Sequence, residues 1–209
     1  MPEKILIQKK WQYSVHEYHE WISGSSAIVN SILPDHLCDF FLNKHVKRPN
    51  RFFGEAIVLR EMSRHCSGYL WYNSFQWLMW KDFSKVPGMV QKTFLQHLCE
   101  VLKEKVNEIR WAAKEYVIQS GVEPKVPDIS LLNKGKQSHF IEVKLPLKPN
   151  SKDSSKLDDD IHEGQLEGLA LMKKYLNCSV EIIWLYPEGM TFDKPDYEDQ
   201  FMYIYDSLG

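Results

Sequence analysis

Apolar residues recur along most of the chain at intervals that predict regular secondary structure. Steps of three and four residues, as in Leu95, Leu98 and Val101, predict amphipathic helices, and short apolar runs rich in aromatic or β-branched residues predict strands. The predicted helices cover residues 11–22, 34–41, 54–66, 93–116 and 161–175. The predicted strands cover residues 69–80 (a strand or hairpin), 126–132, 139–145, 180–186 and 201–205.

The order of these elements predicts the fold class. Two strands joined by the polar turn NKGKQS are followed by a helix and a buried strand, which predicts an α/β domain with a mixed central sheet flanked by helices, and with additional N-terminal and inserted helices. We expect one domain over residues 1–209. Its predicted parts are a helical N-terminal decoration (1–50), a core (54–187), a mobile polar loop (147–160) and a C-terminal edge strand (188–209).

Composition narrows the class of protein. With 209 residues, 44% hydrophobic and 26% charged, the chain is expected to fold, and a disordered tail is excluded. No apolar run approaches the ~20 residues of a membrane span, and no signal peptide begins the chain, so we expect a soluble, non-secreted protein of the cytoplasm, or of the nucleus in a eukaryote. The four cysteines form no Cys-x-x-Cys pair, which argues against a zinc knuckle.

The strongest chemical signal is Asp128, which follows a proline and precedes the triplet Glu142-Val143-Lys144 by fourteen positions. Alternation along a strand puts Glu142 and Lys144 on one face and Val143 on the other, so we expect the charged pair at an open edge of the sheet. If the two strands pair through the turn at 133–138, Asp128 lies beside Glu142. Two adjacent carboxylates repel each other unless a cation or a proton lies between them.

Such a carboxylate pair suits Mg²⁺, with Mn²⁺ as a substitute. A bound metal ion lowers the pKa of water and neutralises a scissile phosphate, and a nearby lysine can orient the nucleophile, so the pattern predicts phosphodiester hydrolysis. We expect no organic cofactor. The alternative interpretation is an ordinary cross-strand salt bridge on a surface hairpin, worth about 0–1 kcal/mol.

The segments VPDISLL (126–132) and FIEVKLP (140–146) resemble the PD-(D/E)xK nuclease superfamily, whose members have the restriction-endonuclease-like fold. The resemblance implies that Asp128 and Glu142 are metal ligands, that the Val143 carbonyl is a further ligand, and that Lys144 is the catalytic lysine. It also implies cleavage that leaves a 5′-phosphate.

Two outlying residues extend this interpretation. Glu55 begins the inward stripe of the 54–66 helix, where the resemblance implies a metal-supporting acid, although the helix dipole alone also favours an acid there. An acid on the 93–116 helix is a second candidate for that role: Glu100, Glu104 or Glu108. Gln165 lies on an otherwise apolar stripe, and the resemblance implies that it faces the active site; the alternative is an amide that binds local backbone.

The formal net charge is −2, so any contact with nucleic acid must use local groups of positively charged residues. The predicted phosphate contacts are Lys44, Lys47, Arg48, Arg51 and Lys148, with a solvated linker as the alternative for the first four. The acidic run 158–160 is interpreted as the cap of the following helix.

The resulting prediction is a Mg²⁺-dependent endonuclease that acts on DNA as a homodimer. A restriction-type enzyme is slightly favoured, because a compact chain without bulk positive charge fits site-specific contact. A repair, recombination or mobile-element nuclease of the same fold is the first alternative. A non-catalytic module that binds nucleic acid or protein is the second.

Overall fold

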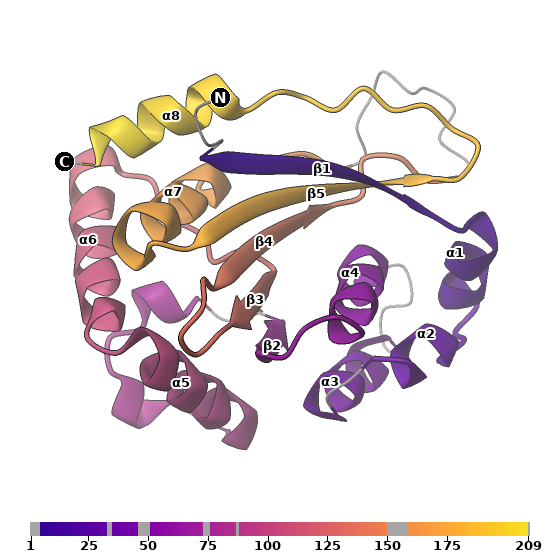
Figure 1. Cartoon of the computed structure of the whole chain (residues 1–209), viewed down its shortest axis with the longest axis horizontal. Helices are drawn as coiled ribbons and strands as arrows, with labels where there is room; N and C mark the ends of the chain where they lie inside the picture. The colour runs from indigo at the N-terminus through magenta and orange to yellow at the C-terminus, as the bar shows by residue number, and fades with distance from the viewer. Residues whose placement is uncertain are drawn as a thin grey trace.

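The computed structural model describes residues 5–32, 35–45, 51–72, 76–86, 88–149 and 159–208. Five strands form one mixed sheet in the order β1-β5-β4-β3-β2 (Figure 1). Strands β1, β5 and β4 are parallel, whereas β3 pairs antiparallel with both β4 and β2. Their bounds are β1 Leu6–Tyr13, β2 Tyr69–Tyr72, β3 Ile129–Leu132, β4 His139–Lys144 and β5 Ser179–Pro187. The predicted α/β class with a mixed sheet is confirmed.

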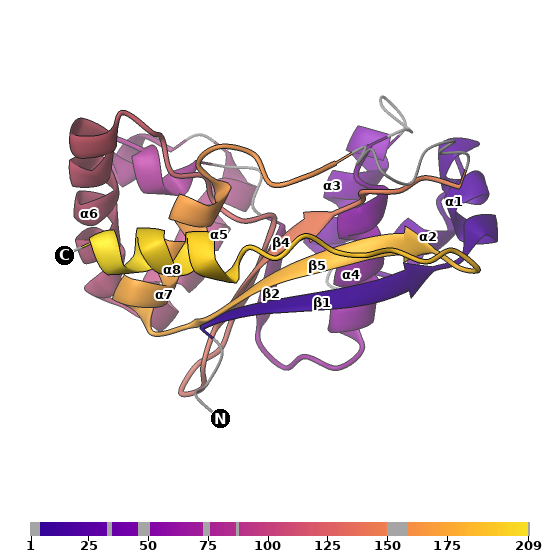
Figure 2. The ribbon, with the colours of Figure 1, turned by 90° about the horizontal axis from the view of Figure 1, so that it is seen from above.

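Helices cover both faces of this sheet (Figures 1 and 2). One layer contains α1 (Val15–Ile22), α2 (Ala27–Asn30), α3 (Asp35–His45) and α4 (Phe53–Ser63). The other contains α5 (Met89–Leu102), α6 (Lys105–Ser120), α7 (Gln165–Leu176) and α8 (Glu198–Ser207), with the 3₁₀ turns η1 (Trp77–Met79) and η2 (Phe83–Lys85). Within the described ranges, no helix has the length and hydropathy that a membrane crossing requires.

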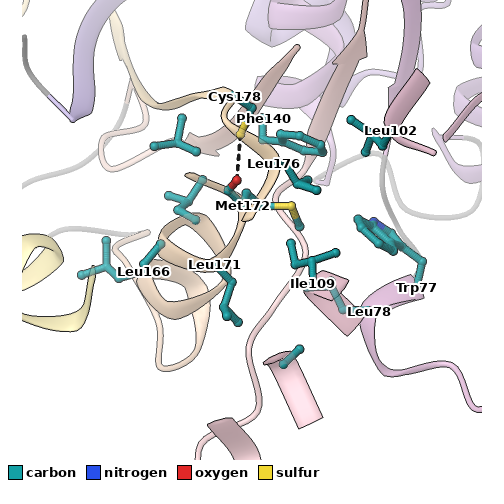
Figure 3. Close-up of a cluster of buried hydrophobic side chains, with 14 of the residues drawn as sticks. Trp77, Leu78, Leu102, Ile109, Phe140, Leu166, Leu171, Met172, Leu176 and Cys178 are labelled. Carbon is teal, nitrogen blue, oxygen red and sulfur yellow. Dashed lines mark hydrogen bonds between the residues drawn. The ribbon is translucent and has the colours of Figure 1, made fainter. Parts of the chain in front are cut away.

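Each layer buries its own hydrophobic cluster against the sheet, because successive residues of a strand face opposite sides. On β4, Phe140 packs with the α5–α8 layer, while Ile141 and Val143 pack with the α1–α4 layer. Figure 3 shows Phe140 beside Leu176 and Met172 of α7. The mixed sheet is therefore held between two separate cores.

The predicted N-terminal helix over 11–22 begins four residues too early. Residues 6–13 form the edge strand β1 rather than the beginning of a helix, and helix α1 starts only at Val15. The strand pairs with β5 along all of its length, from Leu6 opposite Val180 to Tyr13 opposite Pro187. Its middle carries Lys9 and Lys10, which are typical of protected sheet edges and hide the apolar signal of a strand. The described part of the first fifty residues thus forms an edge strand of the sheet as well as helices.

The C-terminal edge strand predicted over 188–209 is also wrong, because residues 198–207 form helix α8. Phe201 and Ile204 are buried at a helical spacing, and Glu198 and Asp199 occupy the first turn, where the helix dipole favours acids. The tyrosines of this segment suggested a strand through their β propensity. Burial of one helical face against α7 outweighs that propensity.

Two helix predictions need new boundaries. The predicted helix over 93–116 is two helices, interrupted at Lys103, whose φ of 53° is left-handed. The apolar stripe continues across the break from Leu102 to Val106, so periodicity could not reveal it. Helix α7 begins at Gln165 rather than 161, with Gly164 in the left-handed conformation as its N-cap, so the acidic run is not its cap.

The segment that carries Asp128 is held by side-chain and backbone contacts. The side-chain amide of Gln76 donates to the carbonyl of Pro124 at 3.0 Å and accepts from the N–H of Val126 at 2.9 Å. The Lys125 N–H donates to the carbonyl of Gly164 at 2.7 Å, directly before α7. A β-carbon on Gly168, one turn into α7, would lie 1.7 Å from the Lys125 carbonyl oxygen. Glycine is therefore required for α7 to approach this segment.

Gly168→Ala is expected to destabilise the protein by about 1–3 kcal/mol, because a backbone atom blocks the new methyl group. For a chain of this length the loss lowers the Tm by roughly 2–4 °C per kcal/mol, measured by thermal denaturation. Gly54→Ala is the matched control, since its methyl group would meet side-chain atoms and no backbone atom, the nearest being those of Leu185 and Val143 at 3.2 Å. Equal Tm values for the two variants would contradict the close packing of α7.

Candidate active site

Glu142 and Lys144 lie together on one face of β4, as their spacing predicts, but not at an open edge. Strand β4 has β5 on one side and β3 on the other, and helix α7 packs over the face that carries the pair. Glu142 is 2% exposed and Lys144 is 3% exposed. The prediction of an open edge was wrong because two strands continue the sheet beyond the predicted hairpin on one side and one beyond it on the other.

Asp128 is placed beside Glu142 by an unusual end to the β3–β4 ladder. Ile129 pairs with Ile141, so the same register places Asp128 opposite Glu142. One Asp128 carboxylate oxygen accepts a hydrogen bond from the Val143 N–H at 2.9 Å. Continued pairing would put Pro127 opposite Val143, and proline has no N–H to donate to the Val143 carbonyl. The Asp128 side chain thus takes the place of the next ladder bond.

Two helices from opposite layers contribute Gln165 and Glu55. The Gln165 amide nitrogen donates to the Glu142 carboxylate, and its oxygen accepts from the His162 N–H at 2.7 Å, so this side chain contacts both the carboxylate and the local backbone. Glu55 lies in the first turn of α4, where its carboxylate accepts from the Tyr72 hydroxyl at 3.4 Å. The Lys144 ammonium lies 3.2 Å from the Glu142 carboxylate. The sequence therefore identified a set of residues that the fold gathers.

The alternative acids on the predicted 93–116 helix lie elsewhere. Glu100 is paired with Lys134, which belongs to the turn between β3 and β4, at the other end of these strands from Asp128. Glu104 and Glu108 lie at the beginning of α6. Repulsion from Asp128 instead contributes to the raised pKa of Glu55. Among these acids, Glu55 is the one that joins the site.

Two residues of the site were not predicted. Asp159, interpreted from the sequence as part of a helix cap, accepts a hydrogen bond from the Leu145 N–H at 3.0 Å and lies 3.5 Å from the Lys144 ammonium. Tyr72, at the end of β2, reaches Glu55. No local pattern marks either residue, because their proximity to the site arises from the sheet order and from the path of the chain before α7.

The carboxyl groups of the site suppress one another's ionisation. Burial, with repulsion from Asp128, raises the pKa of Glu55 to about 8. Burial raises the pKa of Asp128 to about 6, against the opposing hydrogen bond from Val143 and the charge of Lys144. Burial and the neighbouring Asp128 also raise the pKa of Glu142 well above its usual range. Burial alone would lower the pKa of Lys144, but Glu142, Asp159 and Asp128 together raise it, so the ammonium stays charged.

The donor set fits a partly hydrated Mg²⁺ ion. Within the described part of the chain, no three acidic, histidine or cysteine side chains are grouped closely enough to form a complete metal cage. Mg²⁺ does not need such a cage, because it keeps several waters and commonly binds one or two carboxylates. Asp128 and Glu142 provide two, and the repulsion between them is one cause of the raised pKa of Glu142, which a bound cation would relieve. Glu55 and the Val143 carbonyl are the further candidate ligands.

The predicted phosphate contacts are only partly described. Lys44 is exposed near the end of α3, with its ammonium 5.7 Å from the centre of the Phe40 ring. Arg51 is exposed before α4, and its carbonyl accepts from the Trp21 indole at 3.1 Å. Lys148 is exposed four residues after Lys144. Lys47 and Arg48 lie outside the described residues.

One cavity lies away from this site. It has a volume of about 770 Å³ between β1 and α4 and is lined by Trp11, Ile57 and Arg60, among others. The Arg60 guanidinium is already paired with Glu17. The carboxylates of the candidate site do not line this cavity, so the size of the cavity does not change which residues form the candidate site.

Comparisons with known protein families, curated proteins and solved structures found no match for this chain.

The raised pKa of Glu55 predicts a pH-dependent stability. A carboxyl group whose pKa is higher in the folded chain stabilises the fold below its unfolded pKa, and this contribution is lost as pH rises through the folded value. For Glu55 the window runs from 4.5 to about 8. In metal-free buffer, Glu55→Gln is expected to raise the Tm at pH 8 and to leave it nearly unchanged at pH 4, measured by thermal denaturation. The exposed Glu163→Gln is the control, and parallel Tm curves for wild type and Glu55→Gln would contradict the burial of this acid.

Proposed function

We propose that the protein is a Mg²⁺-dependent deoxyribonuclease with a PD-(D/E)xK active site on a restriction-endonuclease-like sheet. The observation that carries the proposal is the hydrogen bond from the Val143 N–H to Asp128, which holds this acid beside Glu142. Lys144 and Gln165 both contact Glu142. An ordinary surface salt bridge does not account for four acids and a lysine gathered at the end of a central strand.

The chain's own residues divide the chemistry of phosphodiester hydrolysis among them. Asp128 and Glu142 would hold Mg²⁺, which when bound supplies an acidified water and neutralises the scissile phosphate. Lys144 is cationic, so it stabilises developing charge and orients the nucleophile rather than accepting its proton. Gln165 fixes the orientation of the Glu142 carboxylate through its amide. Glu55, approaching from the α4 side, supports the metal or its water.

DNA is the proposed substrate, and cleavage would leave a 5′-phosphate. The exposed cations Lys148, Arg51 and Lys44 are proposed phosphate contacts. Duplex cleavage at two strands favours a homodimer with two sites. We favour a restriction-type enzyme slightly over a repair, recombination or mobile-element nuclease, because the net charge of −2 suits specific contacts better than general adhesion to nucleic acid.

A non-catalytic binding module is the second candidate. The burial of Glu142 and Lys144 favours it, because a substrate phosphate must reach groups that are only 2% and 3% exposed. Glu55, Asp128, Asp159 and Gln165 are each partly exposed around this pair, which leaves an approach from their side. The two candidates differ in one measurable property, the metal-dependent cleavage of DNA.

Purified protein incubated with supercoiled plasmid is expected to cleave it with Mg²⁺ and not with EDTA. Glu142→Gln and Lys144→Met are expected to lower the rate by about 10²–10⁴-fold, because they remove a metal ligand and a charge at the reacting phosphate while keeping the side-chain size. Nicked, linear and fragmented DNA are separated by gel electrophoresis.

Lys174→Met, a lysine of α7 away from the carboxylates, is the matched control. Discrete fragments would indicate a restriction-type enzyme, and nicks or progressive shortening would indicate a repair-type nuclease. A folded wild-type protein that cleaves neither plasmid nor linear DNA with Mg²⁺ or Mn²⁺ would overturn the enzymatic proposal in favour of the binding module.

A further inference from the structure

Lys144 has a second acidic partner besides Glu142. One oxygen of Asp159 lies 3.5 Å from the Lys144 ammonium, and the other accepts the Leu145 N–H at 3.0 Å. Both contacts go to consecutive residues at the end of β4. The carboxylate is thereby fixed relative to the strand that carries the lysine, and its charge faces the ammonium.

Asp159 is in turn fixed through its neighbour. Asp160 accepts hydrogen bonds from the Tyr197 hydroxyl and from the Ile161 N–H, each at 2.7 Å. The Tyr197 ring is stacked on that of Trp184, with 11° between the planes and 6.2 Å between the centres. Trp184 is fully buried on β5. A continuous series of contacts therefore connects the core of the protein to Asp159.

We propose that Asp159 is a positioning residue that holds the Lys144 ammonium in place when Glu142 binds a metal ion, and that Tyr197 acts through Asp160 to fix Asp159. This inference rests on the proposed function. Lys144 lies 3.2 Å from Glu142, so a cation on Glu142 competes for the same carboxylate and repels the ammonium. Asp159 pairs with the ammonium independently of Glu142, and this pairing offsets the repulsion.

Two substitutions separate a role of charge from a role of shape. Asp159→Asn keeps an oxygen that can accept the Leu145 N–H but removes the charge, whereas Asp159→Ala removes both. We expect both variants to lower kcat for plasmid cleavage by about 10–100-fold with little change in KM, as for other residues that orient a catalytic group. Asp206→Asn, an exposed acid of α8, is the control for charge.

A second pair tests the support of Asp159. Tyr197→Phe removes the hydroxyl that binds Asp160 and keeps the ring that stacks on Trp184. It is expected to lower kcat less than Asp159→Asn, because the Asp159 charge remains next to the Lys144 ammonium. Tyr203→Phe removes an exposed hydroxyl from the same region and should leave kcat unchanged.

A measurement without activity tests the contact itself. In a thermal double-mutant cycle, Asp159→Asn should lower the Tm of the wild type more than that of Lys144→Met, because the ammonium that pairs with the Asp159 charge is absent there. Equal decreases in the two backgrounds would overturn the inference.

The two proposals fail in distinguishable ways. If the folded wild type cleaves no DNA, the proposed function is overturned, and the positioning role with it. If the wild type cleaves and Asp159→Asn keeps the wild-type kcat while Asp159→Ala is impaired, only the inference is overturned. Asp159 is then an acceptor for the Leu145 N–H and no more.

Discussion

The close approach of Asp128 and Glu142 at the end of the central strand is the constraint on which the site depends. Two carboxylates side by side in a buried setting cost free energy unless a positive charge or a proton joins them. In this protein the compensation comes from Lys144 on the same strand and from the hydrogen bond of the Val143 N–H. The pKa of both acids is still raised, first by burial and, for Glu142, also by the charge of Asp128.

The position of β4 in the sheet determines which other residues can contact Asp128 and Glu142. A strand with neighbours on both sides offers access only beyond the end of its ladder, and the ladder with β3 ends at Ile129 and Ile141. Past that point the two helical layers supply one residue each, Glu55 from α4 and Gln165 from α7. The site therefore exists only where both layers are docked, and its geometry depends on the packing of α7 at Gly168.

Sequence reasoning found the parts of the site that lie within one hairpin. Strand alternation and a short turn are local rules, so Asp128, Glu142 and Lys144 could be brought together from their spacing alone. Glu55 and Gln165 were found because a polar residue on an apolar helical stripe is conspicuous. Asp159 and Tyr72 were missed, since they join the site through sheet order and loop path, which are non-local.

The errors in the predicted fold also arise where contacts between residues far apart in the sequence determine the structure. Strand β1 is specified by its pairing with β5, more than 170 residues away, and its own lysines mask the apolar pattern. Helix α8 is specified by packing against α7, which buries Phe201 and outweighs the β propensity of the tyrosines in α8. The segment before α8 contains Tyr197, which donates to Asp160, so a region misread from local propensity also contacts the end of the sheet where the candidate site lies. Because Tyr197 comes from the far end of the chain and stacks on Trp184 of β5, the surroundings of Asp159 depend on β5 and the C-terminal segment as well as on β4.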